Sequence, residues 1–507
     1  MPEFGQSRGR IVMLVDNGVL GDSRVQKQAE SAAARGWEVF LLGRSKQARR
    51  WKIGEARVRL LPFESSLGKR VHEHRPGYLR HPLSYRNRKL AENKVVSNQA
   101  SKRILDSQIA LSTTTQQRFK RKVLSSARLA RALQGRWVML RARATQRVHS
   151  DRREMTSPLD RFTTAALKLS YGDSAWRKLD PELLEFEAVY GPEIDRLRPD
   201  IIHANDFRML GVGARATWRA RAAGRDVKLV WDAHEFLPGL KPWSSHPRWH
   251  VAQILHERQF AQYADAVVTV TDPLAELLKI EHNLPETPTV VLNAPLTAQS
   301  NQTTVADIRT RAGVPAGAPL LVYSGAAAPQ RGLDTMVEGL QSLPETHIVF
   351  VVRLPANEYA QSLVEQARQL GVADRLHLVD YVPVEQIVPF LSTATIGVIP
   401  AHKWPNHEIS LGTKFFEYSH ARLPIVTSNL KAMATMVQET GQGEVFLAED
   451  TADYVRAVRK VLADLEGYRR AYDDAERLTS WTWERQAEVL DGVYQSLRDQ
   501  QGARQRK

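Results

Sequence analysis

Arg10-Ile11-Val12-Met13-Leu14-Val15 is a run of five apolar residues behind a single arginine. A continuous apolar run is typical of a strand that is buried on both faces of a parallel sheet. A loop (16–23) and a predicted helix (24–35) follow it, and Gly36 leads into a second apolar run at 37–42. This pattern predicts two parallel strands joined by a right-handed crossover. It favours an alternating α/β fold.

Similar apolar runs recur along the rest of the chain. In the first half they lie at 200–203, 228–231, 266–270 and 289–292. In the second half they lie at 320–323, 348–352, 376–379, 396–399, 425–427 and 444–447. The polar stretch 297–304 between the two series predicts a linker. We therefore predict two Rossmann-like domains (1–300 and 301–480) and a final helical segment (481–507).

Composition excludes several classes of site. The chain has 507 residues and no cysteine, which rules out disulfides, thiolate metal sites and cysteine nucleophiles. No window approaches the roughly 18 apolar residues that span a bilayer, and residues 1–10 lack a signal-peptide pattern. We therefore expect a cytoplasmic protein, with peripheral contact to the inner face of the plasma membrane as one option.

The basic charge is concentrated in one segment. The formal net charge is +15, and residues 69–178 contain 26 Lys+Arg against 7 Asp+Glu. The alternating pattern breaks between 66 and 180, where we predict a basic helical insertion with long helices over 118–153. Apolar residues recur there near helical spacing: Val123, Leu124, Ala127, Leu129, Ala130, Leu133, Trp137 and Leu140.

Three interpretations of this insertion stay open. It is a helical hairpin packed on the N-terminal domain with solvated arginines, a surface for anionic lipid, or a surface for an anionic polymer such as nucleic acid. Nucleic acid is the least favoured, because no aromatic stacking platform or groove-reading motif is visible.

A carboxylate and two cations are the candidates for a nucleotide site. Glu417 lies on a short predicted helix that runs into the strand at 425–427, so it could accept hydrogen bonds from a ribose diol. The guanidinium of Arg331, in the turn that begins with Gly325, matches a pair of diphosphate oxygens. Lys414 could supply a second charge. The alternative is an amphipathic surface helix with a solvated Glu417.

The loop after the first strand is a second candidate. Its residues Gly18 and Gly21 would let backbone amides approach an anion at the start of the helix that carries Arg24. The loop is not a G-x-G-x-x-G and no phosphate-loop lysine follows, which weakens dehydrogenase and nucleoside triphosphatase interpretations. A helix merely capped by Asp22 or Ser23 is an equal and compatible alternative.

Several short motifs, in order, resemble those of glycosyltransferase family 4. They are His203-Ala204-Asn205-Asp206, Asp232-Ala233-His234-Glu235, Asn293-Ala294-Pro295, Arg331-Gly332-Leu333-Asp334 and Lys414-Phe415-Phe416-Glu417-Tyr418. The resemblance implies a GT-B fold, with two Rossmann-like domains facing across a cleft, and retention of anomeric configuration. It places His234 in the cleft, Glu417 on the donor ribose, and Arg331 and Lys414 on the diphosphate.

The chain departs from the family pattern at two points. Ala326 stands where the family commonly has a first cation after the glycine. The family's paired glutamates are eight residues apart, but Ile409 lies eight before Glu417, with Glu408 displaced by one. We therefore expect Glu408 near the donor sugar without assigning it the role of the first glutamate.

The sequence thus predicts a glycosyltransferase that moves a sugar from a nucleoside diphosphate donor to a hydroxyl acceptor. A basic face would suit a lipid-linked or anionic glycan acceptor in envelope polysaccharide or glycolipid assembly. No Asp-x-Asp motif is present, so we expect no cofactor and no essential metal. The alternatives are a nucleotide-sugar epimerase of the same fold and a non-catalytic scaffold that binds a membrane or polyanion.

Overall fold

The computed structural model describes residues 8–64, 82–111, 118–154, 158–240, 247–297, 306–353 and 358–505. These residues form two compact units. The first contains residues 1–64, 186–241 and 256–507, and the second contains 65–185 and 242–255. The predicted linker at 297–304 lies, apart from residue 297, outside the described residues.

The first unit contains an eight-stranded sheet in the order β3-β4-β2-β1-β5-β6-β7-β8. Its strands are β1 (Arg10–Leu14), β2 (Glu38–Ser45), β3 (Arg49–Ile53), β4 (Ala56–Pro62), β5 (Ile201–Asn205), β6 (Lys228–Ala233), β7 (Ala266–Thr269) and β8 (Thr289–Val290). All neighbours pair in parallel except β3 and β4. The central strand β1 is almost wholly buried, as its apolar run predicts.

Helices connect and cover these strands. They are α1 (Ser23–Ala34), α7 (Glu182–Leu197), α8 (Asp206–Ala222), α9 (Pro247–Ala261) and α10 (Asp272–His282). Strand order reverses between β1 and β5, so the loops that follow these two strands flank the first sheet's switch point.

The β3–β4 hairpin is absent from the sequence-based prediction. Its strand β3 is largely exposed, so it lacks the apolar run that marks the other strands. Gly54, at φ +52°, and Glu55 form a two-residue turn between the strands. A glycine in such a turn between alternating residues is the local signal that predicts a hairpin.

The second sheet has six parallel strands in the order β11-β10-β9-β12-β13-β14. They are β9 (Leu320–Ser324), β10 (His347–Val351), β11 (Leu376–Val379), β12 (Ile396–Ile399), β13 (Ile425–Ser428) and β14 (Gly443–Phe446). This order is that of a doubly wound dinucleotide-type fold, whose ligands bind where strand order reverses, here between β9 and β12. The prediction of two Rossmann-like sheets is confirmed.

Helices pack on both faces of the second sheet and leave one buried cluster on each face. They are α11 (Ile308–Ala312), α12 (Leu333–Gly339), α13 (Glu358–Gln369), α14 (Ile387–Leu391), α15 (Pro405–Glu408), α16 (Thr413–His420), α17 (Lys431–Thr440) and α18 (Thr451–Ala463). Two shorter helices, α19 (Leu465–Arg469) and α20 (Ala475–Ser480), lead to the final helix α21 (Trp483–Gln505).

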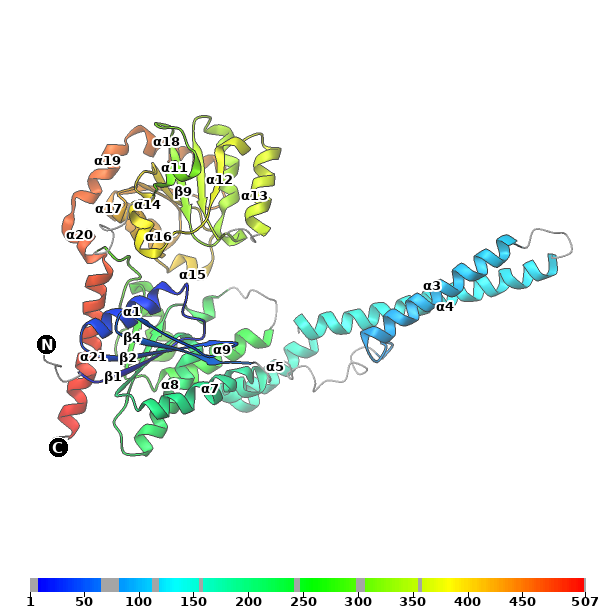
Figure 1. Cartoon of the computed structure of the whole chain (residues 1–507), viewed down its shortest axis with the longest axis horizontal. Coiled ribbons are helices and arrows are strands. Elements are labelled where there is room, and N and C mark those ends of the chain that lie inside the picture. The colour runs from blue at the N-terminus through cyan, green and yellow to red at the C-terminus, as the bar shows by residue number, and fades with distance from the viewer. Residues whose placement is uncertain are drawn as a thin grey trace. The chain divides into compact units, whose positions relative to one another are not determined.

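Helix α21 packs on the first sheet although it follows the second in sequence (Figure 1). Trp483, Leu490, Tyr494 and Leu497 join the buried cluster around β1. Trp483 donates its backbone amide to the carbonyl of Pro295 at 2.8 Å. The final helix is therefore part of the first sheet's core.

The second unit is helical. Helices α3 (Arg88–Leu111) and α4 (Arg118–Glu154) run side by side as a long hairpin, and α5 (Pro158–Tyr171) and α6 (Trp176–Leu179) follow (Figure 1). The sequence predicts long helices over 118–153, and the structure has a single helix there. No described helix has the length and apolar character needed to cross a membrane.

We predict that Gly397→Ala in β12 destabilises the second sheet. A Cβ at this position would lie 2.4 Å from a ring carbon of Tyr418, whose hydroxyl accepts a hydrogen bond from the Ser324 amide at 3.0 Å. Because the ring cannot move without losing that bond, the unfolding free energy should fall by about 1–3 kcal/mol, measured by denaturant titration.

The matched control is Gly492→Ala in α21. A Cβ there meets nothing within 4 Å, so helix propensity alone should leave stability unchanged or raise it by up to about 1 kcal/mol. Equal effects of the two substitutions would contradict the packing of Tyr418 against β12.

Candidate active site

The switch point of the second sheet brings together Gly325, Lys414 and Arg331. Gly325 follows β9 at φ +141°, and a Cβ there would lie 2.6 Å from both Cε and Nζ of Lys414. Glycine therefore leaves the space in which the Lys414 side chain crosses the end of β9. The ammonium lies 5.0 Å from the centre of the Tyr323 ring.

The charges of this cluster are linked. Burial and the Arg331 guanidinium together lower the pKa of Lys414 to about 8, although Glu417 favours its charged form. Burial raises the pKa of Glu417 against the attraction of Lys414 and Lys27. The three residues that the sequence assigned to the donor thus lie in one electrostatic group.

Among the described residues, neither Arg331 nor Lys414 forms an ion pair with a carboxylate, and the buried Nε of Arg331 has no hydrogen-bond partner. A buried donor without an acceptor is costly unless a ligand supplies the acceptor. The end of β9 therefore gathers buried positive charge that an anionic ligand could pair with.

Sequence analysis missed three residues of this group. Arg353 lies two residues after β10 and Tyr381 two residues after β11. Burial raises the pKa of Tyr381, Arg353 lowers it, and Glu417 raises it. Their positions just beyond predicted strands, at the carboxyl edge of the sheet, are a signal that could have found both.

Lys27 of α1 is the third. It is 4% exposed, and its ammonium donates to the Ala294 carbonyl at 2.5 Å and the Asn293 side-chain oxygen at 3.2 Å. Burial and Arg24 lower its pKa to about 7, although Glu417 favours its charged form. A lysine in an amphipathic helix normally indicates a solvated face, so no sequence signal distinguished it.

Loops of the first sheet reach residues of this group. The amide of Asn293 donates to the hydroxyl of Thr413 at 3.2 Å, and the hydroxyl of Thr271 donates to the Ile409 carbonyl at 2.8 Å. A Cβ on Gly21 would lie 3.7 Å from a guanidinium nitrogen of Arg353. The Asn-Ala-Pro motif and the loop after β1 therefore approach the second sheet's switch point.

The loop after β1 also caps its helix. The Asp22 carboxylate accepts a hydrogen bond from the Val25 amide at 3.3 Å, which is the capping alternative from the sequence. Gly21 adopts φ +91°, a conformation that glycine tolerates best, and Gly18 lies beside the carbonyl of Arg44. Approach of an anion to these two glycines stays a prediction.

Arg24 lies in a buried ion pair. It is 4% exposed, its guanidinium binds the Asp232 carboxylate through two bonds of 3.0 Å, and it also donates to the Val291 carbonyl at 2.8 Å. These contacts occupy the guanidinium within the fold. Arg24 therefore positions Asp232, and its predicted place among the ligand-binding residues of the loop after β1 stays a prediction.

His234 lies beside two carboxylates. Its Nε2 is 3.1 Å from an oxygen of Asp232, and its Nδ1 is 3.7 Å from an oxygen of Asp206. Burial opposes protonation, but the two carboxylates outweigh it and raise the pKa of His234 to about 9. His234 is thus a cation at neutral pH and is 21% exposed, so it can donate a hydrogen bond to a ligand.

His203 and α21 complete the network around Asp232. His203 Nε2 lies 3.6 Å from the Asp232 carboxylate, and its Nδ1 is 2.8 Å from the Tyr494 hydroxyl. Burial alone would raise the pKa of Asp232, but Arg24 and His234 hold it well below its usual value. Asp232 is therefore ionised and fixes the orientation of His234.

Glu408 is hydrogen-bonded to the protein backbone. Its carboxylate accepts a hydrogen bond from the backbone amide of Lys431 at 2.8 Å, at the start of α17. A carboxylate at a helix start is stabilised by the helix dipole. Contact of Glu408 with a donor sugar stays a prediction.

Among the described residues, no group of three His, Asp or Glu side chains is arranged to hold a metal ion.

Two family models match the chain in order. "Glycosyltransferase Family 4" matches residues 127–295 and "Glycosyl transferases group 1" matches residues 305–478. A curated relative, the D-inositol 3-phosphate glycosyltransferase of Geodermatophilus obscurus, is 24% identical over 312 residues, which cover 54% of this chain and 67% of the relative.

Solved structures share the fold. Sucrose-phosphate synthase from Thermosynechococcus elongatus superposes with a TM-score of 0.61 at 15% identity, covering 96% of this chain and 99% of that one. HepE from Anabaena, in complex with UDP and glucose, superposes with a TM-score of 0.56 at 13% identity, covering 96% and 100%. The protein is therefore a glycosyltransferase with the GT-B fold. More particularly, the chain belongs to glycosyltransferase family 4.

We predict that His234 makes stability fall as pH rises. Its folded pKa of about 9 exceeds the unfolded value of 6.5, so its contribution is fully present below pH 6.5 and is lost as pH rises through about 9. The difference in melting temperature between wild type and His234→Gln should therefore shrink between these two pH values.

Lys27 acts in the opposite sense because its pKa is lowered to about 7, but it cancels in the difference because both proteins contain it. Burial raises the pKa of Asp206 to about 7, so the difference reports His234 together with this neighbouring carboxylate. A difference that stays constant over this range would show that His234 is not charged by its carboxylate neighbours.

Proposed function

We propose that the donor of this glycosyltransferase is a nucleoside diphosphate sugar bound at the switch point of the second sheet. The observation that carries the proposal is the pair of cations at the end of β9, Arg331 and Lys414, neither of which forms an ion pair with a carboxylate of the described residues. A diphosphate would supply the missing acceptors and neutralise both charges. Glu417, in the same group, would accept hydrogen bonds from the ribose hydroxyls.

The same cations suit the chemistry of transfer. When the bond between the anomeric carbon and the diphosphate oxygen breaks, negative charge develops on that oxygen, and fixed cations stabilise it. Tyr381 interacts electrostatically with Arg353, Glu417 and Arg331, which places it in the same group. Arg331 and Lys414 thereby favour departure of the nucleoside diphosphate.

His234 would act at the sugar from the first sheet. As a partly exposed cation oriented by Asp232, it can donate a hydrogen bond to a sugar hydroxyl while the anomeric carbon becomes electron-poor. Family membership supports retention of configuration. We propose attack by the acceptor hydroxyl on the face that the diphosphate leaves, with a leaving phosphate oxygen taking the hydroxyl proton.

We propose a hydroxyl acceptor that is lipid-linked or an anionic glycan, in envelope polysaccharide or glycolipid assembly. The relative named for D-inositol 3-phosphate supports a phosphate-bearing acceptor, and the HepE complex supports a uridine nucleotide as the first donor to test.

We predict that two substitutions separate the parts of the nucleotide site. Arg331→Gln should weaken binding of UDP by about 10- to 100-fold, the loss expected for one charge-assisted hydrogen bond, and leave binding of uridine unchanged. Glu417→Gln should weaken both ligands, because it alters the ribose contact. Calorimetric titration measures the four constants.

The control is Arg368→Gln, which removes an equally charged arginine that is 64% exposed on α13. If no nucleoside diphosphate binds wild type, or if Arg331→Gln binds UDP as tightly as the control does, the donor site is not at the end of β9.

Transfer should persist without divalent metal. We expect turnover of the bound nucleotide sugar to be retained in excess chelator, because Arg331 and Lys414 supply the positive charge that a metal would otherwise provide. The measurement is the initial rate of nucleoside diphosphate release with and without chelator. Complete loss of the rate, restored by added Mg²⁺ or Mn²⁺, would contradict this assignment.

A further inference from the structure

The helical unit exposes an apolar stripe on α4. Leu129, Leu133, Trp137 and Leu140 are spaced by four, four and three residues, so they lie on one face of the helix. Each keeps between 47% and 65% of its surface exposed. A contiguous apolar face of this kind marks a contact surface on a protein that is otherwise well packed.

Cations border this stripe and acids are missing from it. From Arg118 to Ser150 the sequence contains 10 Lys+Arg and no Asp+Glu. Arg136, Arg143 and Arg147 are exposed and spaced by seven and four residues, so they form a row along one edge of the stripe. None of the three has an ion-pair partner among the described residues. These three guanidinium groups can therefore pair with anions.

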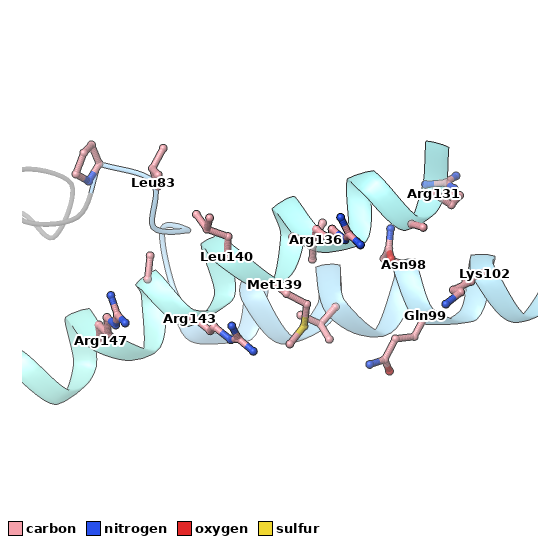
Figure 2. Close-up of a pocket in the computed structure, with 16 residues that line it drawn as sticks. Leu83, Asn98, Gln99, Lys102, Arg131, Arg136, Met139, Leu140, Arg143 and Arg147 are labelled. Carbon is pink, nitrogen blue, oxygen red and sulfur yellow. The ribbon is translucent and has the colours of Figure 1, made fainter. Parts of the chain in front are cut away.

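A groove between α3 and α4 continues the same surface (Figure 2). Its volume is about 1050 Å³, Val138 and Met139 contribute to its apolar wall, and Lys102 and Arg131 add two cations. The three arginines of the row and Leu140 line it as well, and no Asp or Glu does. The groove therefore combines positive charge with an apolar floor.

We propose that α4 docks this unit on the surface of an anionic phospholipid bilayer. The arginine row would pair with lipid phosphates, and the leucines and Trp137 would enter the boundary between head groups and acyl chains. Tryptophan is favoured at that boundary because one end of its ring system is apolar and the other can donate a hydrogen bond. The groove would receive head groups beside the stripe.

Two other occupants fit less well. A second copy of the chain would bring the arginine row against like charge, which opposes association. A nucleic acid would meet the arginines but would leave the leucines of the stripe in water, since bases stack on aromatic faces and not on leucine. Charge and apolar area together favour the bilayer.

The test is flotation of the full chain with vesicles of phosphatidylcholine alone and of phosphatidylcholine mixed with phosphatidylglycerol, at low and high salt. We expect binding only to the anionic vesicles, weakened by salt. The triple variant Arg136→Gln, Arg143→Gln, Arg147→Gln should bind roughly 100-fold more weakly. The pair Leu133→Gln, Trp137→Gln should lower binding at least about tenfold.

The control triple replaces Arg196, Arg368 and Arg485, which are exposed arginines of the first unit, with glutamine. It removes the same charge and should bind as wild type does. Because all the replaced side chains are exposed, circular dichroism should show unchanged helix content.

Several outcomes would overturn the proposal. They are equal binding to both vesicle types, an equal loss in the control triple, or no loss in the Leu133 and Trp137 variant. A dimer in light scattering that this variant abolishes would assign the stripe to a second copy of the chain. Binding to DNA but not to vesicles, lost in the arginine triple, would assign the row to nucleic acid.

Discussion

A carboxylate without solvent exposure, Asp232, sets the arrangement of the first sheet's carboxyl edge. A buried charge is tolerated only when it is paired and hydrogen-bonded, so the chain must bring compensating groups to it. Arg24 comes from α1, His203 from β5 and His234 from the residue that follows β6. The need to neutralise one carboxylate therefore fixes a helix, two strand ends and the orientation of a cationic histidine.

At the switch point of the second sheet, the side chains that need an opposite charge are cations. This switch point gathers Arg331 and Lys414, and among the described residues no carboxylate forms an ion pair with either, although Glu417 favours the charged form of Lys414. Glycine at 325 leaves room for the lysine, and the positions of both cations are fixed by elements that are buried in the sheet's core. The buried carboxylate at the carboxyl edge of the first sheet is thus balanced by side chains of the protein, whereas the cations at the edge of the second sheet could pair with an anionic ligand. Such a pairing of edges suits a two-substrate enzyme.

Periodicity predicted most of the strands, because parallel strands buried on both faces read as apolar runs. It missed β3, whose exposed residues carry charge, although Gly54 and Glu55 were a usable turn signal. Motifs found Glu417, Arg331 and His234, but could not show that Arg24 is committed to Asp232, 208 residues away. Lys27 was not predicted as a site residue for the same reason, because only tertiary packing distinguishes a buried lysine from a solvated one. The exposure of the stripe on α4 also depends on packing, since helical spacing alone favours burial.

The position of α21 has a consequence for synthesis. The core around β1 includes Trp483, Leu490 and Tyr494, so the first domain cannot complete its core until the last part of the chain has left the ribosome. The second sheet, whose core residues lie between 308 and 481, is finished before that moment. The domain that is translated first is therefore the last to reach its native core. The nascent chain therefore carries the first sheet without the helix that completes its core while residues 291–482 are made.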